Sequence, residues 1–226
     1  MALIALFLGC AHIGMIEGAI PLEAGERRWA MDVQVSRSPG PVGSSTGIPL
    51  PQVGGQWRTG LGANTDLGIH LYSIGNGIDV RYRFAQEGRW HFAIDPRLDV
   101  FVVPLGTLLF YTSLDLKLPV LVEWAFSERW HATGGLGVVG RQTFFSGGTP
   151  ELTTSASSFE LLTGGGLRMS YHKARFQLGI SGNLYVDVVR GTGLYGGLGM
   201  DLGFGGLRTK ASPAPASSAG TARRSR

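Results

Sequence analysis

The sequence is poor in charge and contains a single cysteine. Charged residues make up 16% of the 226 positions, against roughly 25% in an average soluble domain. With Cys10 alone, an intramolecular disulfide is excluded. No apolar run approaches the ~18 residues of a membrane-spanning helix, so a helical membrane protein is excluded as well. A hydrophobic content of 43% equally excludes an intrinsically disordered chain.

The excess of positive charge is confined to the C-terminal end. The net charge is +4, but residues 208–226 hold five basic residues and no acid, which leaves 15 of the 20 basic residues against 16 acidic ones. The body is nearly neutral, and its charge indicates no nucleic-acid partner. Residues 206–226 are rich in Pro, Ala and Ser and are predicted to be disordered. They form either a solvated tail or a contact with anionic lipid or an anionic envelope polymer.

Glycine is abundant, with 36 residues, and it follows no Gly-X-Y period, which excludes collagen. From residue 27 onward the sequence alternates with period two, which is typical of strands. The sequence predicts an all-β chain, an antiparallel up-and-down barrel of about ten strands (8 to 12) over residues 27–205. The predicted strands are 28–36, 52–62, 67–73, 78–84, 90–103, 108–126, 130–140, 158–171, 175–188 and 194–204.

In each predicted strand one face is apolar and the other polar. The charged residues of all ten strands fall on the polar face. A soluble lipocalin-like barrel buries the apolar face, whereas a transmembrane barrel turns it toward lipid and keeps the polar face in the lumen. In the second case, the predicted luminal charge network is Asp79, Arg81, Arg83, Asp95, Arg97, Asp99, Asp115, Lys117, Glu123, Arg168, Asp187 and Asp201.

Connection lengths and aromatic positions favour the transmembrane arrangement. Connections at one end, such as 63–66 and 127–129, are short, whereas 37–51 and 141–157 at the other end are long. Short periplasmic turns with longer outer loops are typical of outer-membrane barrels, and both termini are then periplasmic. The aromatic residues of the apolar face gather at the short-turn end, as an interfacial girdle does. They are Trp29, Phe84, Trp90, Trp124, Phe126, Trp130, Tyr171, Phe176 and Phe204.

The last predicted strand resembles the C-terminal signal of bacterial outer-membrane β-barrels. Residues 199–204 begin with glycine, alternate, and end in the aromatic Phe204, although 22 residues follow it. The start resembles a lipoprotein signal, in which an apolar segment (1–9) ends in a small residue before a lipidated cysteine, here Cys10. A plain signal peptide and an ordinary buried cysteine are the alternatives. Residues 10–26 are then a linker. The resemblance implies a small outer-membrane β-barrel protein, with membrane lipid as its partner.

The residues suggest no catalytic chemistry. No Gly-x-Ser-x-Gly or His-Glu-x-x-His motif occurs, and no two of the five histidines share a predicted strand. We therefore expect no catalytic residues, no metal and no cofactor. The leading hypothesis is a structural envelope component or a minor channel with an ion-paired lumen. The alternatives are a carrier or channel for small amphipathic molecules, a soluble lipocalin-like ligand-binding barrel and a barrel-embedded lipid-modifying enzyme. The sequence does not indicate an oligomeric state.

Glycine also bears on which face is the lumen. In the predicted strands it lies mainly on the polar face, for example at positions 54, 68, 179 and 197. Glycine normally weakens a strand. Inside a narrow barrel, however, it leaves room for long side chains opposite, so this distribution favours the polar face as the lumen.

Overall fold

The computed structural model describes residues 16–37, 50–104, 109–149, 152–173, 175–189 and 194–205. Cys10, the signal-like residues 1–9 and the tail 206–226 lie outside this range. The described residues form eleven strands and no α-helix, and none of their segments is a helix long and apolar enough to cross a membrane. The strands are β1 (Arg27–Arg37), β2 (Leu50–Gly62), β3 (Thr65–Tyr72), β4 (Gly75–Glu87), β5 (Trp90–Ile94), β6 (Arg97–Pro104), β7 (Leu109–Ala125), β8 (Trp130–Thr149), β9 (Leu152–Lys173), β10 (Phe176–Asp187) and β11 (Leu194–Phe204).

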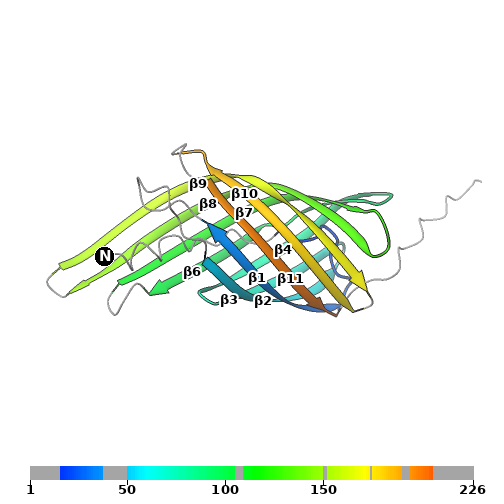
Figure 1. Ribbon diagram of the computed structural model, residues 1–226, viewed down its shortest axis with the longest axis horizontal. Coiled ribbons are helices and arrows are strands. Elements are labelled where there is room, and N and C mark those ends of the chain that lie inside the picture. Colours follow the sequence, from blue (N-terminus) through cyan, green and yellow to red (C-terminus); the bar gives the residue numbers. More distant parts are fainter. Residues whose placement is uncertain are drawn as a thin grey trace, which may run out of the picture.

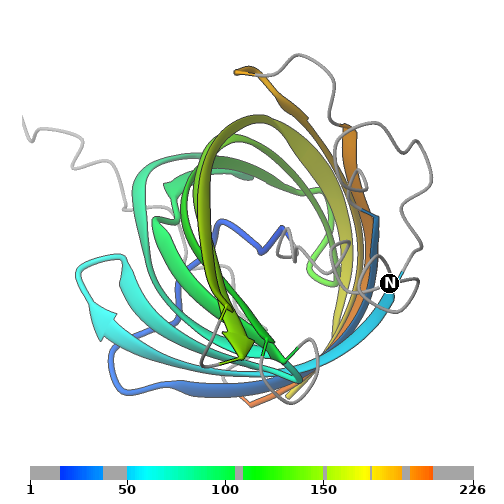
Figure 2. The same ribbon diagram turned by 90° about the vertical axis from the view of Figure 1, so that its left-hand side faces the viewer.

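The strands close into one antiparallel barrel of ten positions (Figures 1 and 2). Strands β5 and β6 lie end to end, and both pair with β4 on one side and β7 on the other. They are one strand interrupted at Pro96, which has no N–H to donate to the ladder. The barrel closes between the first and last strands, where Trp29 pairs with Phe204. The predicted all-β barrel of about ten strands is confirmed.

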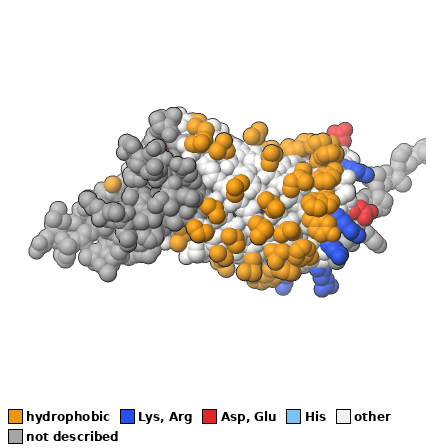
Figure 3. Space-filling model, in the orientation of Figure 1, with side chains coloured by type: hydrophobic (Ala, Val, Ile, Leu, Met, Phe, Trp, Pro, Cys, Tyr) orange, Lys and Arg blue, Asp and Glu red, His pale blue; other side chains and the backbone are white. Residues whose placement is uncertain are grey.

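Burial is inverted relative to a soluble protein. Arg58, Arg81 and Arg141 are among the largest fully buried side chains, whereas Leu136 is 74% and Leu198 is 71% exposed. Hydrophobic side chains cover the outer wall, most densely beside the end that carries Lys and Arg (Figure 3). The apolar face therefore points outward, and the alternative of a soluble barrel with an apolar cavity is wrong.

One predicted connection is instead strand. Residues 141–157, expected to be a long loop, extend β8 and β9 into a hairpin that reaches Thr149 paired with Leu152. This hairpin projects beyond the other strands (Figure 1). Thr and Ser dominate residues 153–158, and the β-branched Thr is favoured in strands even where neighbouring residues are not apolar. The hydrophobic alternation used to set strand limits does not detect such a segment.

A charged residue on the outer wall tests where the membrane lies. Leu118 on β7 is 48% exposed and lies six positions from Trp124 of the girdle, which is about 20 Å along the strand. Leu118→Arg is expected to destabilise the barrel by ~2–4 kcal/mol in lipid, because arginine then lies near the bilayer midplane. Urea unfolding in phospholipid vesicles measures the loss.

Leu61→Arg is the matched control for this prediction. Leu61 is also exposed, at 58%, but it lies next to the turn at the girdle end of β2. Its substitution is expected to cost ~0–1 kcal/mol, as near a membrane interface. Equal losses for the two variants would contradict a membrane-spanning wall.

Candidate functional site: a charged lumen and an N-terminal strap

The predicted luminal charges line the inner face of the barrel. Ten of the twelve are buried, and Arg83 and Asp201 are half-buried. Glycines opposite make room for inward-pointing side chains, of the network and beside it. A Cβ on Gly54 would lie 2.6 Å from an oxygen of Asp32, and one on Gly197 would lie 2.8 Å from the amide of Gln34. These glycines are therefore needed for space at a crowded lumen, as their position on the polar face suggests.

Arg58 on β2, which is not part of the predicted network, is the centre of the largest ion-pair cluster among the described residues. Its side chain is fully buried. The guanidinium lies 2.5 Å from Asp66, 2.6 Å from Asp79 and 2.8 Å from Glu17. Three carboxylates from β3, β4 and the N-terminal segment thus share one cation. Since an unpaired buried charge is costly, each member of the cluster depends on the others.

The N-terminal strap, residues 16–24, runs inside the barrel (Figure 2). We expected residues 10–26 to be a linker, but from Ile16 onward the chain occupies the lumen before entering β1. Ile16, Ala19 and Leu22 are buried. The sequence carries only a weak signal for this segment. Its apolar residues lie outside every predicted strand, which suggests that they pack against another part of the chain.

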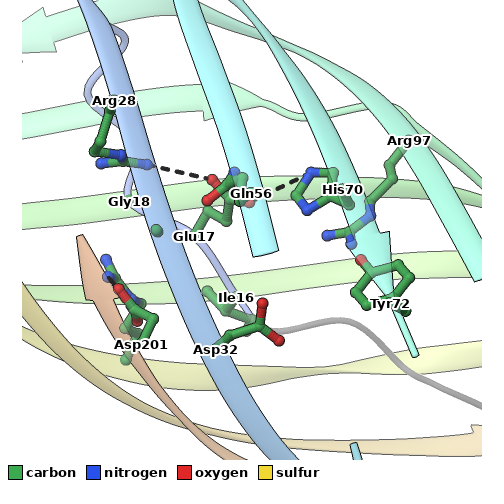
Figure 4. Close-up of a pocket in the computed structure, with 12 residues that line it drawn as sticks. Ile16, Glu17, Gly18, Arg28, Asp32, Gln56, His70, Tyr72, Arg97 and Asp201 are labelled. Atoms are coloured by element: carbon green, nitrogen blue, oxygen red, sulfur yellow. Dashed lines mark hydrogen bonds and ion pairs between the residues drawn. The ribbon is translucent and has the colours of Figure 1, made fainter. Parts of the chain in front are cut away.

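Polar contacts tie the strap to several strands of the barrel. The Ala19 N–H donates to Glu123 on β7 at 2.5 Å, and the Leu22 N–H donates to Asp66 at 2.8 Å. Arg81 donates to the Gly18 carbonyl at 2.5 Å. Figure 4 shows the Glu17 side chain between Arg28 and His70, each 3.7 Å from it. Contacts to β1, β3, β4 and β7 therefore hold the strap in place.

Luminal glycines form the surface on which the strap lies. A Cβ on Gly60 would overlap the Glu23 carbonyl, and one on Gly166 or Gly135 would lie 2.7 or 3.1 Å from the Ile16 side chain. Gly60 also exchanges backbone hydrogen bonds with residues 25 and 26, at 3.0 and 2.9 Å. Side chains at these three positions would therefore collide with the strap.

The remaining predicted charges pair in smaller groups instead of one ladder. Asp99 binds Arg97 at 3.0 Å and Lys117 at 2.6 Å. Asp115 accepts two hydrogen bonds from Arg141, at 2.9 and 2.7 Å. Elsewhere, Arg168 meets Asp201 at 2.8 Å, Arg83 donates to Asn64 at 2.6 Å, and Asp187 accepts from the Val189 N–H at 2.9 Å.

The predicted luminal charge network therefore divides into separate groups. Asp79 and Arg81 turn toward Arg58 and Asp66, on β2 and β3. Asp95 is buried, and one of its carboxylate oxygens has no hydrogen-bond partner among the described residues. Register decides the pairing: Asp79 lies opposite Gly68 of β3, which leaves space for the Arg58 guanidinium.

The nine girdle aromatics lie at one end of the barrel, and eight of them meet an aromatic ring of a neighbouring strand, whereas Phe126 lies beside Trp124. Trp90 stacks on Trp124 with ring centres 5.7 Å apart, and Trp130 lies 5.1 Å from Tyr171. The cross-strand register also places Trp57 directly opposite Trp29. β2 extends beyond the start of β1 at this end, so Trp57, in the middle of its strand, falls at the level of the girdle.

A serine–histidine pair lies near the girdle end and was not apparent from the sequence. Ser170 Oγ is 3.0 Å from His172 Nε2, and the His172 ring stacks on that of His131 at 4.3 Å. The carboxylate of Glu123, however, bonds to His131 at 2.5 Å and not to His172. Within the described part of the chain, the base thus lacks the carboxylate that orients it in a Ser-His-Asp triad.

One group of side chains has the residue types of a metal site. Donor atoms of Glu17, His70 and Asp79 lie within 4.8 Å of one another. Arg58, however, lies 2.8 Å from Glu17 and 2.6 Å from Asp79, and Arg81 lies 3.8 Å from Glu17. Because two guanidinium groups already neutralise these carboxylates, the group is better described as an ion-pair cluster than as a cation site.

A closed barrel with a charged interior, an apolar outer wall and an aromatic girdle is a transmembrane β-barrel. No protein-family model and no curated protein sequence matches the chain. Solved structures of bacterial outer-membrane barrels are similar to it, and at such low identities this similarity concerns the fold alone. They include the attachment invasion locus protein Ail of Yersinia pestis (14% identity, covering 80% of this chain and 99% of that one, TM-score 0.45), Neisserial surface protein A (9%, 79% and 96%, TM-score 0.43) and the translocator domain of the autotransporter NalP from Neisseria meningitidis (14%, 92% and 93%, TM-score 0.40).

Proposed function

We propose that this chain is a non-enzymatic outer-membrane barrel whose lumen is closed at rest by the N-terminal strap. It serves as a structural component of the envelope, or as a minor channel that conducts when the strap leaves. The observation that carries this proposal is the position of Glu17, which lies 2.8 Å from the fully buried Arg58. The ion pair ties the strap to the barrel wall inside the lumen.

The barrel is proposed to stand with both termini in the periplasm. The turns next to the start of β1 are short: two residues, Ala63 and Asn64, join β2 to β3 with positive φ angles of 48° and 62°. The long β8–β9 hairpin lies at the opposite end. Short periplasmic turns and longer outer loops are the arrangement of bacterial outer-membrane barrels. Lipidation of Cys10 and a contact of the basic tail with anionic lipid or polymer remain proposals about residues outside the described range.

Reversing the charge of Glu17 tests the closed lumen. Glu17→Arg places a third cation beside Arg58 and Arg81, so the strap is expected to leave the lumen. In planar lipid bilayers the native barrel is expected to be nearly silent. The variant is expected to show stepwise ionic currents at least ~10-fold more often, since loss of ~1.4 kcal/mol of closure already changes the open population tenfold.

Glu128→Arg is the matched control for the bilayer measurement. It makes the same charge reversal at an exposed turn on the girdle side, and its currents should equal those of the native barrel. A steady open current from the native protein would contradict a closed lumen. A silent Glu17→Arg barrel whose strap is shown by proteolysis to be released would restrict the proposal to the structural role.

A further inference from the structure

A depression lies on the outer wall of the barrel across β9, β10 and β11. Its volume is about 1010 Å³ when the open space above it is included. The outward positions in this region alternate between glycine and leucine. Leu184 has Gly165 and Gly196 as its cross-strand neighbours, and Gly182 lies between Leu167 and Leu198. Gly182 and Gly196 thus leave low points beside these leucines, and the depression spans the three strands.

The depression is apolar and lies at mid-depth of the lipid-facing wall. Its rim residues Leu167 and Leu198 are 73% and 71% exposed, and no charged residue lines it. Gly182 lies six positions from Phe176 of the girdle, which is about 20 Å along a strand. With the tilt typical of such barrels, this is close to the middle of the hydrocarbon layer.

The depression does not open into the lumen. The β9–β10 ladder runs without a register shift from Phe176 paired with Lys173 to Asp187 paired with Leu162. The β10–β11 ladder is equally continuous from Phe176 to Val186. An occupant must therefore enter from the membrane. The leucine side chains project outward beyond the glycines on both sides. Only a narrow occupant therefore reaches the glycine backbone.

We propose that this depression is a binding groove for one acyl chain of a membrane lipid. A methylene chain is narrow, flexible and without polar groups, so it fills the glycine floor and contacts the leucine walls. The neighbouring wall of a second barrel is convex and reaches the floor only with isolated side chains. The groove rests on the membrane placement of the barrel and is independent of whether the strap opens the lumen.

The test uses the purified barrel in vesicles of phosphatidylethanolamine and phosphatidylglycerol, doped with a phosphatidylethanolamine that carries a diazirine in the middle of one acyl chain. After irradiation, the cross-linked peptides are mapped by mass spectrometry. Cross-links are expected to concentrate at 165–167, 182–184 and 196–198. The double variant Gly182→Leu with Gly196→Leu fills the floor and is expected to reduce them about fivefold, because it removes the buried apolar contact of the chain.

Both substitutions fit the fold, and a matched control is at hand. A Cβ on Gly182 meets only the flexible end of Leu198 at 3.1 Å, and one on Gly196 meets Leu184 at 3.6 Å. Gly140→Leu makes the same change at an outward glycine of β8, where a Cβ lies 3.8 Å from Phe159. This control should leave the pattern unchanged.

Three results would overturn the groove. They are cross-links spread evenly over the outward residues of all strands, a pattern unaffected by the double variant, and groove peptides without lipid adducts while other outward residues are labelled, as a second copy seated on the groove would give. The failure of the proposed function is a different result, because a constant open current from the native barrel leaves the cross-link map unchanged.

Discussion

Arg58→Ala is expected to lower the free energy of unfolding by about 3–5 kcal/mol, the range for breaking a buried ion pair from one side. The side chain is fully buried, and its removal leaves Glu17, Asp66 and Asp79 with Arg81, His70 and the more distant Arg28 as partners. Three carboxylates then compete for too few cations at membrane depth. Urea unfolding in phospholipid vesicles gives the magnitude, and the temperature at which the folded band disappears from a gel should fall with it.

Two further variants separate charge from packing in this result. Arg58→Met retains most of the side-chain volume but no charge, so it should be nearly as unstable as Arg58→Ala. Arg83→Ala removes an arginine that is half-buried near the turn and donates to Asn64 at 2.6 Å. It should cost less than about 1 kcal/mol, as partly exposed polar contacts do. An Arg58→Met barrel as stable as the native one would show that Arg58 acts by filling space.

Period-two alternation predicts this fold well because each strand of the barrel separates two different environments. Each strand meets lipid on one face and a charged lumen on the other, so a charge such as Asp79 or Arg81 marks its face without ambiguity. The same reasoning places Trp29 and Phe204 together at one level, as the register later shows. Strand limits are less predictable where the alternation of apolar and polar residues ends. For this reason the Thr-rich part of the β8–β9 hairpin was expected to be a loop.

The contents of the lumen were less predictable than its wall. Alternation indicates which residues point inward but not which of them meet, because partners depend on strand tilt and register. Asp66 was expected to lie in a turn, yet it bonds Arg58, Arg81 and the strap. The strap itself has no period, since its residues meet several walls of the barrel at once. Glycines that make room for it, such as Gly60, look in the sequence like those that make room for arginine.

Gly60→Leu is expected to expel the strap. A side chain at this inward position of β2 would overlap the Glu23 carbonyl, and Gly60 is also the residue whose backbone bonds hold residues 25 and 26. The readout is cleavage after Glu17 by a glutamate-specific protease, which is too large to enter a ten-strand barrel. Because proteolysis follows the population of the open form, the cleavage rate should rise about tenfold or more.

Gly55→Leu makes the same substitution on the same strand but on the lipid-facing side, where a Cβ lies 3.9 Å from the Ala30 carbonyl and meets nothing closer. It should leave Glu17 as protected as in the native barrel. Persistent protection in Gly60→Leu would mean that the strap adjusts within the lumen and that the glycine surface is not required. Paired with bilayer recordings, the variant also identifies what closes the barrel. If the strap is cleaved and currents appear, the strap is the barrier. If the strap is cleaved and the barrel remains silent, the luminal ion pairs around Arg58, Asp99 and Asp115 close it without help.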